Sequence, residues 1–212
     1  MVDIIANKYS FFNIEKAVQA FYYIQKLSNT TSKLELIKFL FFADRIHIRK
    51  HFSLISLDNY VALKYGPVAS GSLNILNRQT EYLNNFSERE LSYLDNVQQI
   101  GKYEWKIKQV PDDLLSKNET QSIDKSVALF SGMELSEISH DYPEWKRYKK
   151  LFDMKLVSSR PVKIDDFFRN PDINDSPAIQ KYFGGADPLH EDEGYLLEAK
   201  TFYLQSIGEY DA

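Results

Sequence analysis

Residues 36–44 of this chain read Leu-Ile-Lys-Phe-Leu-Phe-Phe-Ala-Asp, and this run decides the fold. It lies in a helix that we expect to span about residues 33–50. Apolar side chains fall on nearly every face of that helix, a pattern typical of a helix surrounded by other elements. Ser32 precedes the helix and Glu35 follows three residues later, which is the spacing of a capping box. We therefore expect a helical core built around this central helix.

A short strand is expected after the central helix. Residues 57–65 alternate in the manner of a strand that is covered on at least one face. Gly66 and Pro67 should end this strand. Pro67 fits the first turn of a following helix over residues 68–77, because the N–H that proline lacks would be unpaired there in any case.

The rest of the first 156 residues predicts a hairpin and further helices. Two strand-like runs between residues 97 and 110 flank Gly101-Lys102, a plausible hairpin turn. Ser116 and Glu119 form a second capping box before another helix. Short helices are expected over residues 134–140 and 142–152. The predicted fold class is α+β, predominantly α-helical, with a small antiparallel sheet or hairpin.

The composition changes after residue 156, where prolines recur among Asn, Asp and Gly. We expect one helical domain over residues 1–156. Residues 157–212 should form a Pro-containing arm and a last helix from about Glu191 to Ser206, packed on the same domain. The apolar stripe of that helix needs a surface to dock on, and a homodimer formed through it is a further expectation.

Composition and charge exclude several classes of function. The 212 residues carry 26 basic and 30 acidic side chains, a net charge of −4, so the chain has no overall basic footprint for nucleic acid. It contains no cysteine, which excludes a disulfide scaffold and a thiolate nucleophile. The first eight residues lack the pattern of a secretory signal, and no apolar run approaches the roughly 20 residues that span a bilayer. We expect a cytoplasmic protein with no membrane partner.

One constellation could carry metal chemistry. His47 and His51 are four residues apart on the central helix, and Asp44 lies one turn before His47, so the three side chains could share a face. Two imidazoles and a carboxylate suit zinc or iron. The cations at Arg45, Arg49 and Lys50 oppose a second cation there. A metal-dependent hydrolase that uses Asp44, His47 and His51 stays open as the alternative function.

Two other runs have ordinary structural explanations. Ser139-His140-Asp141 contains three hydrolase residue types, but a catalytic triad is assembled in space rather than from neighbours. Residues 146–150 are rich in Lys and Arg beside Trp145 and could contact phosphates, although such a run is more often a solvated helix face. The residues alone therefore show a large core and no catalytic set, and this favours a binding protein over an enzyme.

Two sequence blocks resemble a known family. The run 36–44, followed by Tyr60-Val61-Ala62-Leu63-Lys64-Tyr65-Gly66-Pro67-Val68, is similar to the Panacea domain, also called the SocA-like antitoxin domain, whose members occur with toxins or in phage genomes. The block 135–140 with Trp145 resembles a later family segment. The blocks occur in order over roughly residues 12–150. Residues 51–56 depart from the glycine-containing turn that many members have, and the arm lies largely outside the match.

The resemblance implies an antitoxin that neutralises a co-encoded toxin by direct protein–protein contact. It also implies, for one branch, a proteolytic adaptor that delivers the toxin to a AAA+ protease. No catalytic residue, cofactor or metal is expected on this basis. The motif and partner-binding positions carried over, with Tyr65 and Trp145 as the interface candidates, are Lys38, Asp44, Tyr60, Tyr65, Gly66, Pro67, Val68, His140 and Trp145. Because many antitoxins bind their own promoter, a DNA-binding autorepressor is a third hypothesis, which the net charge disfavours.

Overall fold

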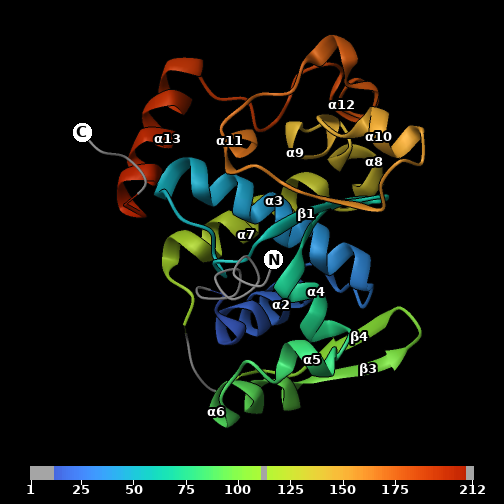
Figure 1. Ribbon diagram of the computed structural model, residues 1–212, viewed down its shortest axis with the longest axis vertical. Helices are drawn as coiled ribbons and strands as arrows, with labels where there is room; N and C mark the ends of the chain where they lie inside the picture. Colours follow the sequence, from blue (N-terminus) through green and yellow to red (C-terminus); the bar gives the residue numbers. More distant parts are fainter. Residues whose placement is uncertain (1–11, 111–113, 209–212) are drawn as a thin grey trace.

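The computed structural model describes residues 12–110 and 114–208. The first eight residues, which lack a secretory pattern, lie outside this part. The described chain is predominantly helical with two small antiparallel sheets, so the predicted α+β class is confirmed. In Figure 1 the C-terminal helices lie on one side of the central helix, and the hairpin of β3 (Val97–Gly101) and β4 (Glu104–Ile107) lies at the opposite end of the molecule.

Helix α3 (Lys33–His51) is the predicted central helix. All but a few of its side chains are buried, and it packs against α2 (Ile14–Ser28), α7 (Lys117–Phe130) and the last helix. It ends where the cap residue Phe52 adopts a left-handed conformation, with φ 58°. A helix that is covered on every side needs apolar residues on every face, which explains the run 36–44.

The capping box at the start of α3 is only half formed. The hydroxyl of Ser32 accepts from the backbone N–H of Glu35 at 3.4 Å, as expected. The Glu35 carboxylate, however, accepts from the hydroxyl of Thr30, and Ser32 N–H donates to that same hydroxyl at 3.0 Å. Thr30 thus replaces the carboxylate as the acceptor for Ser32. The second predicted box is complete, because Ser116 and Glu119 bond reciprocally at the start of α7.

The prediction of a helix over residues 68–77 is wrong at its start. Residues Gly66–Ala69 form strand β2, which pairs antiparallel with β1 (Tyr60–Leu63), and only then does α4 (Ser70–Leu76) begin. Gly66 has φ +103° and lets the chain reverse into a hairpin. Pro67 is tolerated in β2 because this strand lies at the edge of the three-stranded sheet, whose order is β2–β1–β5, with β5 at Ser159–Pro161.

The hairpin predicted within residues 97–110 is confirmed, with its turn at Lys102 and Tyr103, one residue later than predicted. Strand β3 (Val97–Gly101) pairs antiparallel with β4 (Glu104–Ile107), and the register is interrupted between Gln99 and Gly101. The far edge of β4 is tied to the chain before α3, because Trp105 N–H donates to the carbonyl of Thr31 at 2.8 Å. The hairpin thereby packs against α2.

The expected helix over residues 142–152 is two short helices. They are α9 (Pro143–Lys146) and α10 (Lys149–Asp153), separated at Arg147 and Tyr148. Both separating residues bond elsewhere: Arg147 pairs with the carboxylate of Asp166, and Tyr148 donates its hydroxyl to the carbonyl of Pro161 at 2.7 Å. These contacts turn the chain between the two helices. The remaining helical segments are α5 (Thr80–Leu83), α6 (Glu88–Ser92), η1 (Tyr93–Asn96), α8 (Leu135–Ser139), α11 (Ile164–Phe167), η2 (Ile173–Asp175), α12 (Pro177–Phe183) and α13 (Glu193–Ser206).

The segment after residue 156 contacts the rest of the chain at several points. Strand β5 (Ser159–Pro161) pairs antiparallel with β1, and α13 packs against α3. The guanidinium of Arg49 donates to the carbonyls of Phe167 and Leu189 at 2.6 and 2.8 Å. An arm that packs on the same domain would make such contacts, while the division at residue 156 stays a prediction. In the described ranges, none of the helices combines the length and apolar composition that crossing a membrane requires.

Candidate functional site

Three motif residues meet beneath the β1–β2 turn. Lys38 extends from the middle of α3, is fully buried, and donates from Nζ to the carbonyl of Pro67 at 2.8 Å. Gly66 lies directly above it, since a Cβ on Gly66 would come within 2.3 Å of both Lys38 Nζ and Ser139 Oγ. Burial holds the pKa of Lys38 well below its usual value. The lysine therefore fixes the edge strand β2 from inside the molecule.

His140 and Trp145 form the next layer of this site. Their rings stack with centroids 3.7 Å apart, and Phe152 stacks on Trp145 at 5.6 Å. The indole Nε1 donates to the carbonyl of Leu63 at 2.8 Å, which ties α9 to the end of β1. Burial, helped by the charge of Lys38, lowers the pKa of His140 to about 4, so this ring is neutral at physiological pH. The stacked rings of His140 and Trp145 therefore support the β1–β2 turn at Lys64 and Tyr65.

Asp44 holds the other end of β1. One carboxylate oxygen accepts from the backbone N–H of Ile55 at 2.6 Å, and the other accepts from the hydroxyl of Tyr60 at 2.7 Å. Burial raises the pKa of Asp44 to about 7, even though both hydrogen bonds lower it. The loop between α3 and β1 is thus fixed through one side chain of the central helix.

The raised pKa of Asp44 predicts how Asp44→Asn changes the pH dependence of stability. Between about pH 4 and pH 7 the folded chain holds a proton on Asp44 that the unfolded chain has lost. The stability that this proton provides is present below about pH 4 and is lost as pH rises through about 7. The free energy of unfolding of the wild type, minus that of Asp44→Asn, should therefore fall by about 2–4 kcal/mol as the pH rises from 4 to 7.

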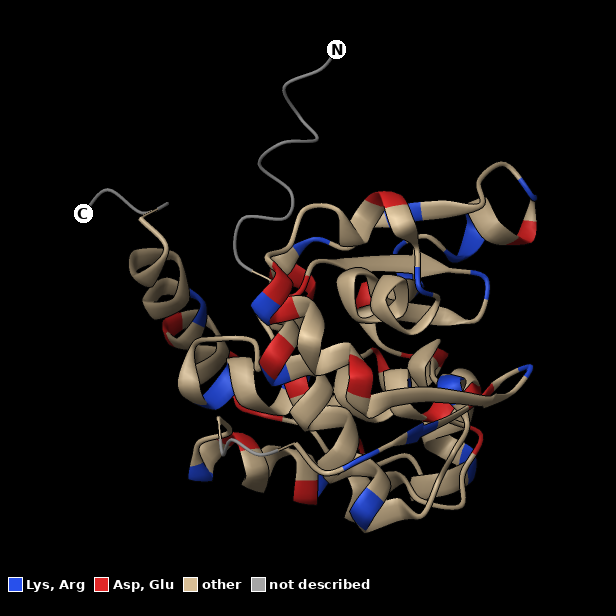
Figure 2. Ribbon diagram, turned by 90° about the horizontal axis from the view of Figure 1, so that it is seen from below, with Lys and Arg blue, Asp and Glu red and all other residues tan. Residues whose placement is uncertain are grey.

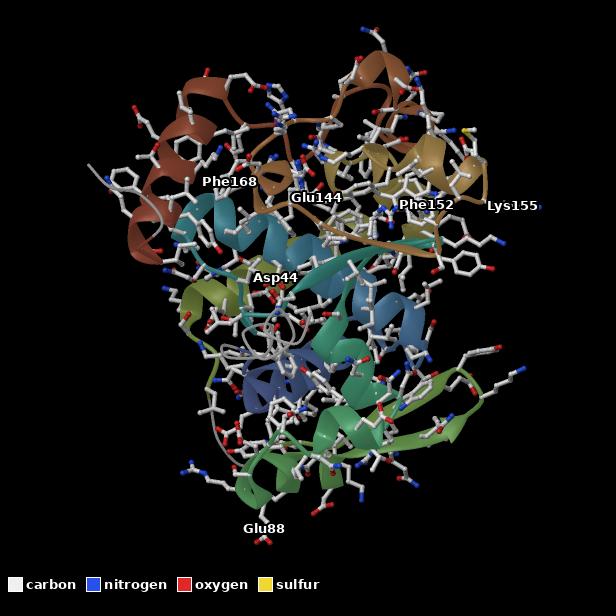
Figure 3. All side chains as sticks on the ribbon, viewed as in Figure 1. Asp44, Glu88, Glu144, Phe152, Lys155 and Phe168 are labelled. Carbon is white, nitrogen blue, oxygen red and sulfur yellow. The ribbon has the colours of Figure 1, made fainter. Side chains whose placement is uncertain are left out.

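Urea unfolding at several pH values measures this difference. The control is Glu88→Gln, because Glu88 is exposed and lies far from Asp44 (Figure 3). Its difference from wild type should change little with pH. A difference for Asp44→Asn that stays constant from pH 4 to pH 7 would contradict the assignment.

The geometry does not favour the metal-site alternative. Both oxygens of Asp44 are taken by Ile55 and Tyr60, and His47 Nδ1 lies 2.7 Å from the carbonyl of Ser53. The rings of His47 and His51 are adjacent, with centroids 4.8 Å apart. Within residues 12–110 and 114–208, no group of three or more His, Cys, Asp or Glu side chains could hold a metal ion.

Eight of the nine carried-over positions lie in the framework. The side chain of His140 is half-buried, and seven others are buried, namely Lys38, Asp44, Tyr60, Gly66, Pro67, Val68 and Trp145. Tyr65 is the exception. Its side chain is 61% exposed at the tip of the β1–β2 turn, where it is free to meet another molecule.

The order and packing of these blocks agree with a comparison against family models. The model described as the antitoxin SocA-like Panacea domain matches residues 36–146, slightly more than half of the chain. The chain belongs to this family. The searches of curated proteins and of solved structures found no match. In this Panacea domain the matched range contains the hairpin, its supports and α9, and it ends before α10 and the arm.

Sequence reasoning missed the role of two arginines in the Panacea domain. Arg45 pairs with the fully buried carboxylate of Glu144, and its guanidinium lies 4.6 Å from the ring centroid of Tyr142. Arg45 also donates to carbonyls at residues 166 and 169, and Arg49 donates to others in the same segment. The signal was available: two arginines four residues apart on a helix that is apolar all round must be buried and paired. They connect α3 to the arm.

Proposed function

We propose that this Panacea-domain protein neutralises a co-encoded protein toxin by direct contact, in the cytoplasm and without catalysis. Membership of the antitoxin-like family carries the proposal. The arrangement of the motif supports it, because buried residues hold the β1–β2 turn in place while Tyr65 stays exposed. An exposed aromatic side chain on a turn whose backbone is held in place is suited to act as a binding hot spot, since the backbone loses little conformational entropy on binding.

Co-expression with the protein encoded by the neighbouring gene tests the proposal. That protein alone should arrest growth, and the Panacea-domain protein should restore growth and co-purify with it. A harmless neighbour that forms no complex would overturn the proposal. The finer expectation of a proteolytic adaptor has its own readout: the toxin should disappear faster after synthesis is blocked when both the antitoxin and a AAA+ protease are present.

Tyr65→Ala should weaken the complex at least about tenfold while leaving the free energy of unfolding unchanged. An aromatic hot spot at an interface is worth about 2 kcal/mol or more, whereas an exposed side chain contributes little to folding. Tyr103→Ala is a matched control, because Tyr103 is also 61% exposed at a hairpin turn and has a lysine over its ring, as Tyr65 does. Titration calorimetry measures the affinity of both variants for the partner. Equal effects of the two variants would argue against Tyr65 as the contact residue.

A further inference from the structure

Three exposed apolar side chains gather beside the β1–β2 turn. Tyr65, Met154 and Leu156 are 61%, 67% and 62% exposed. Two contacts bring α10 and the chain after it to this turn: Leu63 pairs with Ser159 across β1 and β5, and the Trp145 indole that bonds Leu63 also stacks on Phe152 of α10. Figure 3 shows Phe152 and Lys155 beside the end of the β1–β2 hairpin.

Unpaired cations surround these apolar side chains. Residues 146–160 contain six Lys or Arg and a single acidic residue, Asp153, in a chain whose net charge is −4. Three of the six form ion pairs. Lys146 pairs with Asp141 and Asp175, Arg147 pairs with Asp166, and Lys149 pairs with Asp153. The other three are Lys150, Lys155 and Arg160, and Lys64 lies next to Tyr65. Within the described residues no acidic side chain lies within 4 Å of the charged group of any of these four. Figure 2 shows Lys and Arg at loop tips on the side of the molecule away from α13.

Backbone contacts fix the shape of this surface. The chain leaves α10 through two bonds, from Lys155 N–H to the carbonyl of Phe152 at 2.9 Å and from Leu156 N–H to the carbonyl of Leu151 at 3.0 Å. This pattern resembles a Schellman ending, with Lys155 at φ 55°. Lys38 fixes the turn on the other side through the carbonyl of Pro67. A surface held in this way loses little entropy on binding.

We propose that the surface formed by Lys64, Tyr65, Lys150, Met154, Lys155, Leu156 and Arg160, called here the basic apolar surface, binds an acidic protein segment that carries apolar side chains. The inference rests on the proposed function and names the chemistry of the toxin face. Four unpaired cations complement acidic side chains and speed association with them. The three apolar side chains, each more than 60% exposed, complement apolar side chains of the partner segment.

Protein is favoured over nucleic acid by the apolar part of the surface. Contacts to a phosphate backbone come mainly from Lys and Arg and other hydrogen-bond donors. Met154 and Leu156 would gain nothing from such contacts. The surface also draws Lys150, Lys155 and Arg160 from the chain after residue 146, beyond the range of the family match. It therefore joins a turn inside the family match with residues that lie outside it.

Amide chemical-shift mapping on the full chain tests the proposal. The probe is a short synthetic peptide that alternates Glu with Leu and Phe, and the comparison probes are the same peptide with Lys in place of Glu and an oligodeoxythymidylate. The Glu peptide should shift the amides of Tyr65 and residues 154–156. Lys150→Glu/Lys155→Glu should weaken its binding at least about tenfold, because like charges then face each other. Lys106→Glu/Lys117→Glu, at exposed lysines of β4 and α7, is the control and should bind as wild type does.

The remaining outcomes distinguish failure of the basic apolar surface from failure of the antitoxin proposal. No binding of the Glu peptide, or binding of the oligonucleotide at least as tight, overturns the basic apolar surface as a protein site. A complex with the neighbouring gene product that Lys150→Glu/Lys155→Glu leaves intact also overturns it, while the antitoxin proposal stands. A surface that binds the Glu peptide in a protein that forms no complex with its neighbour would overturn the antitoxin proposal alone.

Discussion

Arg45→Met is expected to lower the free energy of unfolding by about 3–5 kcal/mol, because it leaves the carboxylate of Glu144 buried without its partner. Both side chains of this ion pair are fully buried. Arg45 also donates to the carbonyls of residues 166 and 169, so the variant leaves two acceptors of the arm without this donor. Methionine keeps most of the side-chain volume, and the loss is therefore one of charge and hydrogen bonding rather than of packing.

Chemical denaturation with a double-mutant cycle measures this coupling. Arg45→Met/Glu144→Gln should be markedly less destabilised than the sum of the two single variants, because the double variant buries no unpaired charge. Arg89→Met is the control, since Arg89 is 82% exposed and lies 3.7 Å from Glu15. Removal of this exposed arginine should cost less than about 1 kcal/mol. Additive losses for Arg45 and Glu144 would contradict a coupled buried pair.

The fold could be predicted from the sequence wherever one local signal dominated. The run 36–44 is apolar on all faces, and only a surrounded helix satisfies it. The hairpin within residues 97–110 and the cap at Ser116 each follow from residues close by in the sequence. These elements formed where the pattern placed them, because neighbouring segments do not compete with the local preference.

Errors arose where tertiary contacts override a local preference. Pro67 is compatible with both a first helical turn and an edge strand, and the choice depends on β1 and on Lys38, which lies 29 residues earlier. Likewise, residues 142–152 have a helical pattern, but the bonds of Arg147 and Tyr148 to the arm turn the chain. Sequence periodicity contains no information about partners this far away.

The sequence indicated several residues of the candidate site, but not how they are arranged. Resemblance selected Lys38, Gly66, His140 and Trp145, yet nothing local indicates that they stack beneath a single turn. The roles of Arg45 and Arg49 depend on carbonyls more than 100 residues away. The basic run near Trp145 has, on its own, the pattern of a solvated face. Its proximity to Tyr65 depends on the pairing of β1 with β5, which brings distant segments together.

Gly66→Ala is expected to destabilise the protein by at least about 3 kcal/mol, for two separate reasons. The backbone of Gly66 has φ +103°, which costs a residue with a side chain about 1–2 kcal/mol. The new Cβ would also lie 2.3 Å from Lys38 Nζ and Ser139 Oγ. Lys38 is fully buried and bonded to Pro67, so it cannot move aside without losing that bond or bringing its amine against apolar neighbours.

Gly132→Ala separates the two causes. Gly132 has φ +77°, but no atom lies within 4 Å of the position that a Cβ would take there, so this control variant should show the backbone cost alone. Gly66→Ala/Ser139→Ala should recover part of the loss, because the second substitution removes one of the two overlapping atoms. If Gly66→Ala cost no more than Gly132→Ala, the close approach of Lys38 to the turn would be wrong. The proposed partner-binding role of Tyr65 provides a second readout: because Lys38 fixes the strand that follows Tyr65, the Gly66 variant should also bind the proposed toxin partner more weakly than Tyr103→Ala does.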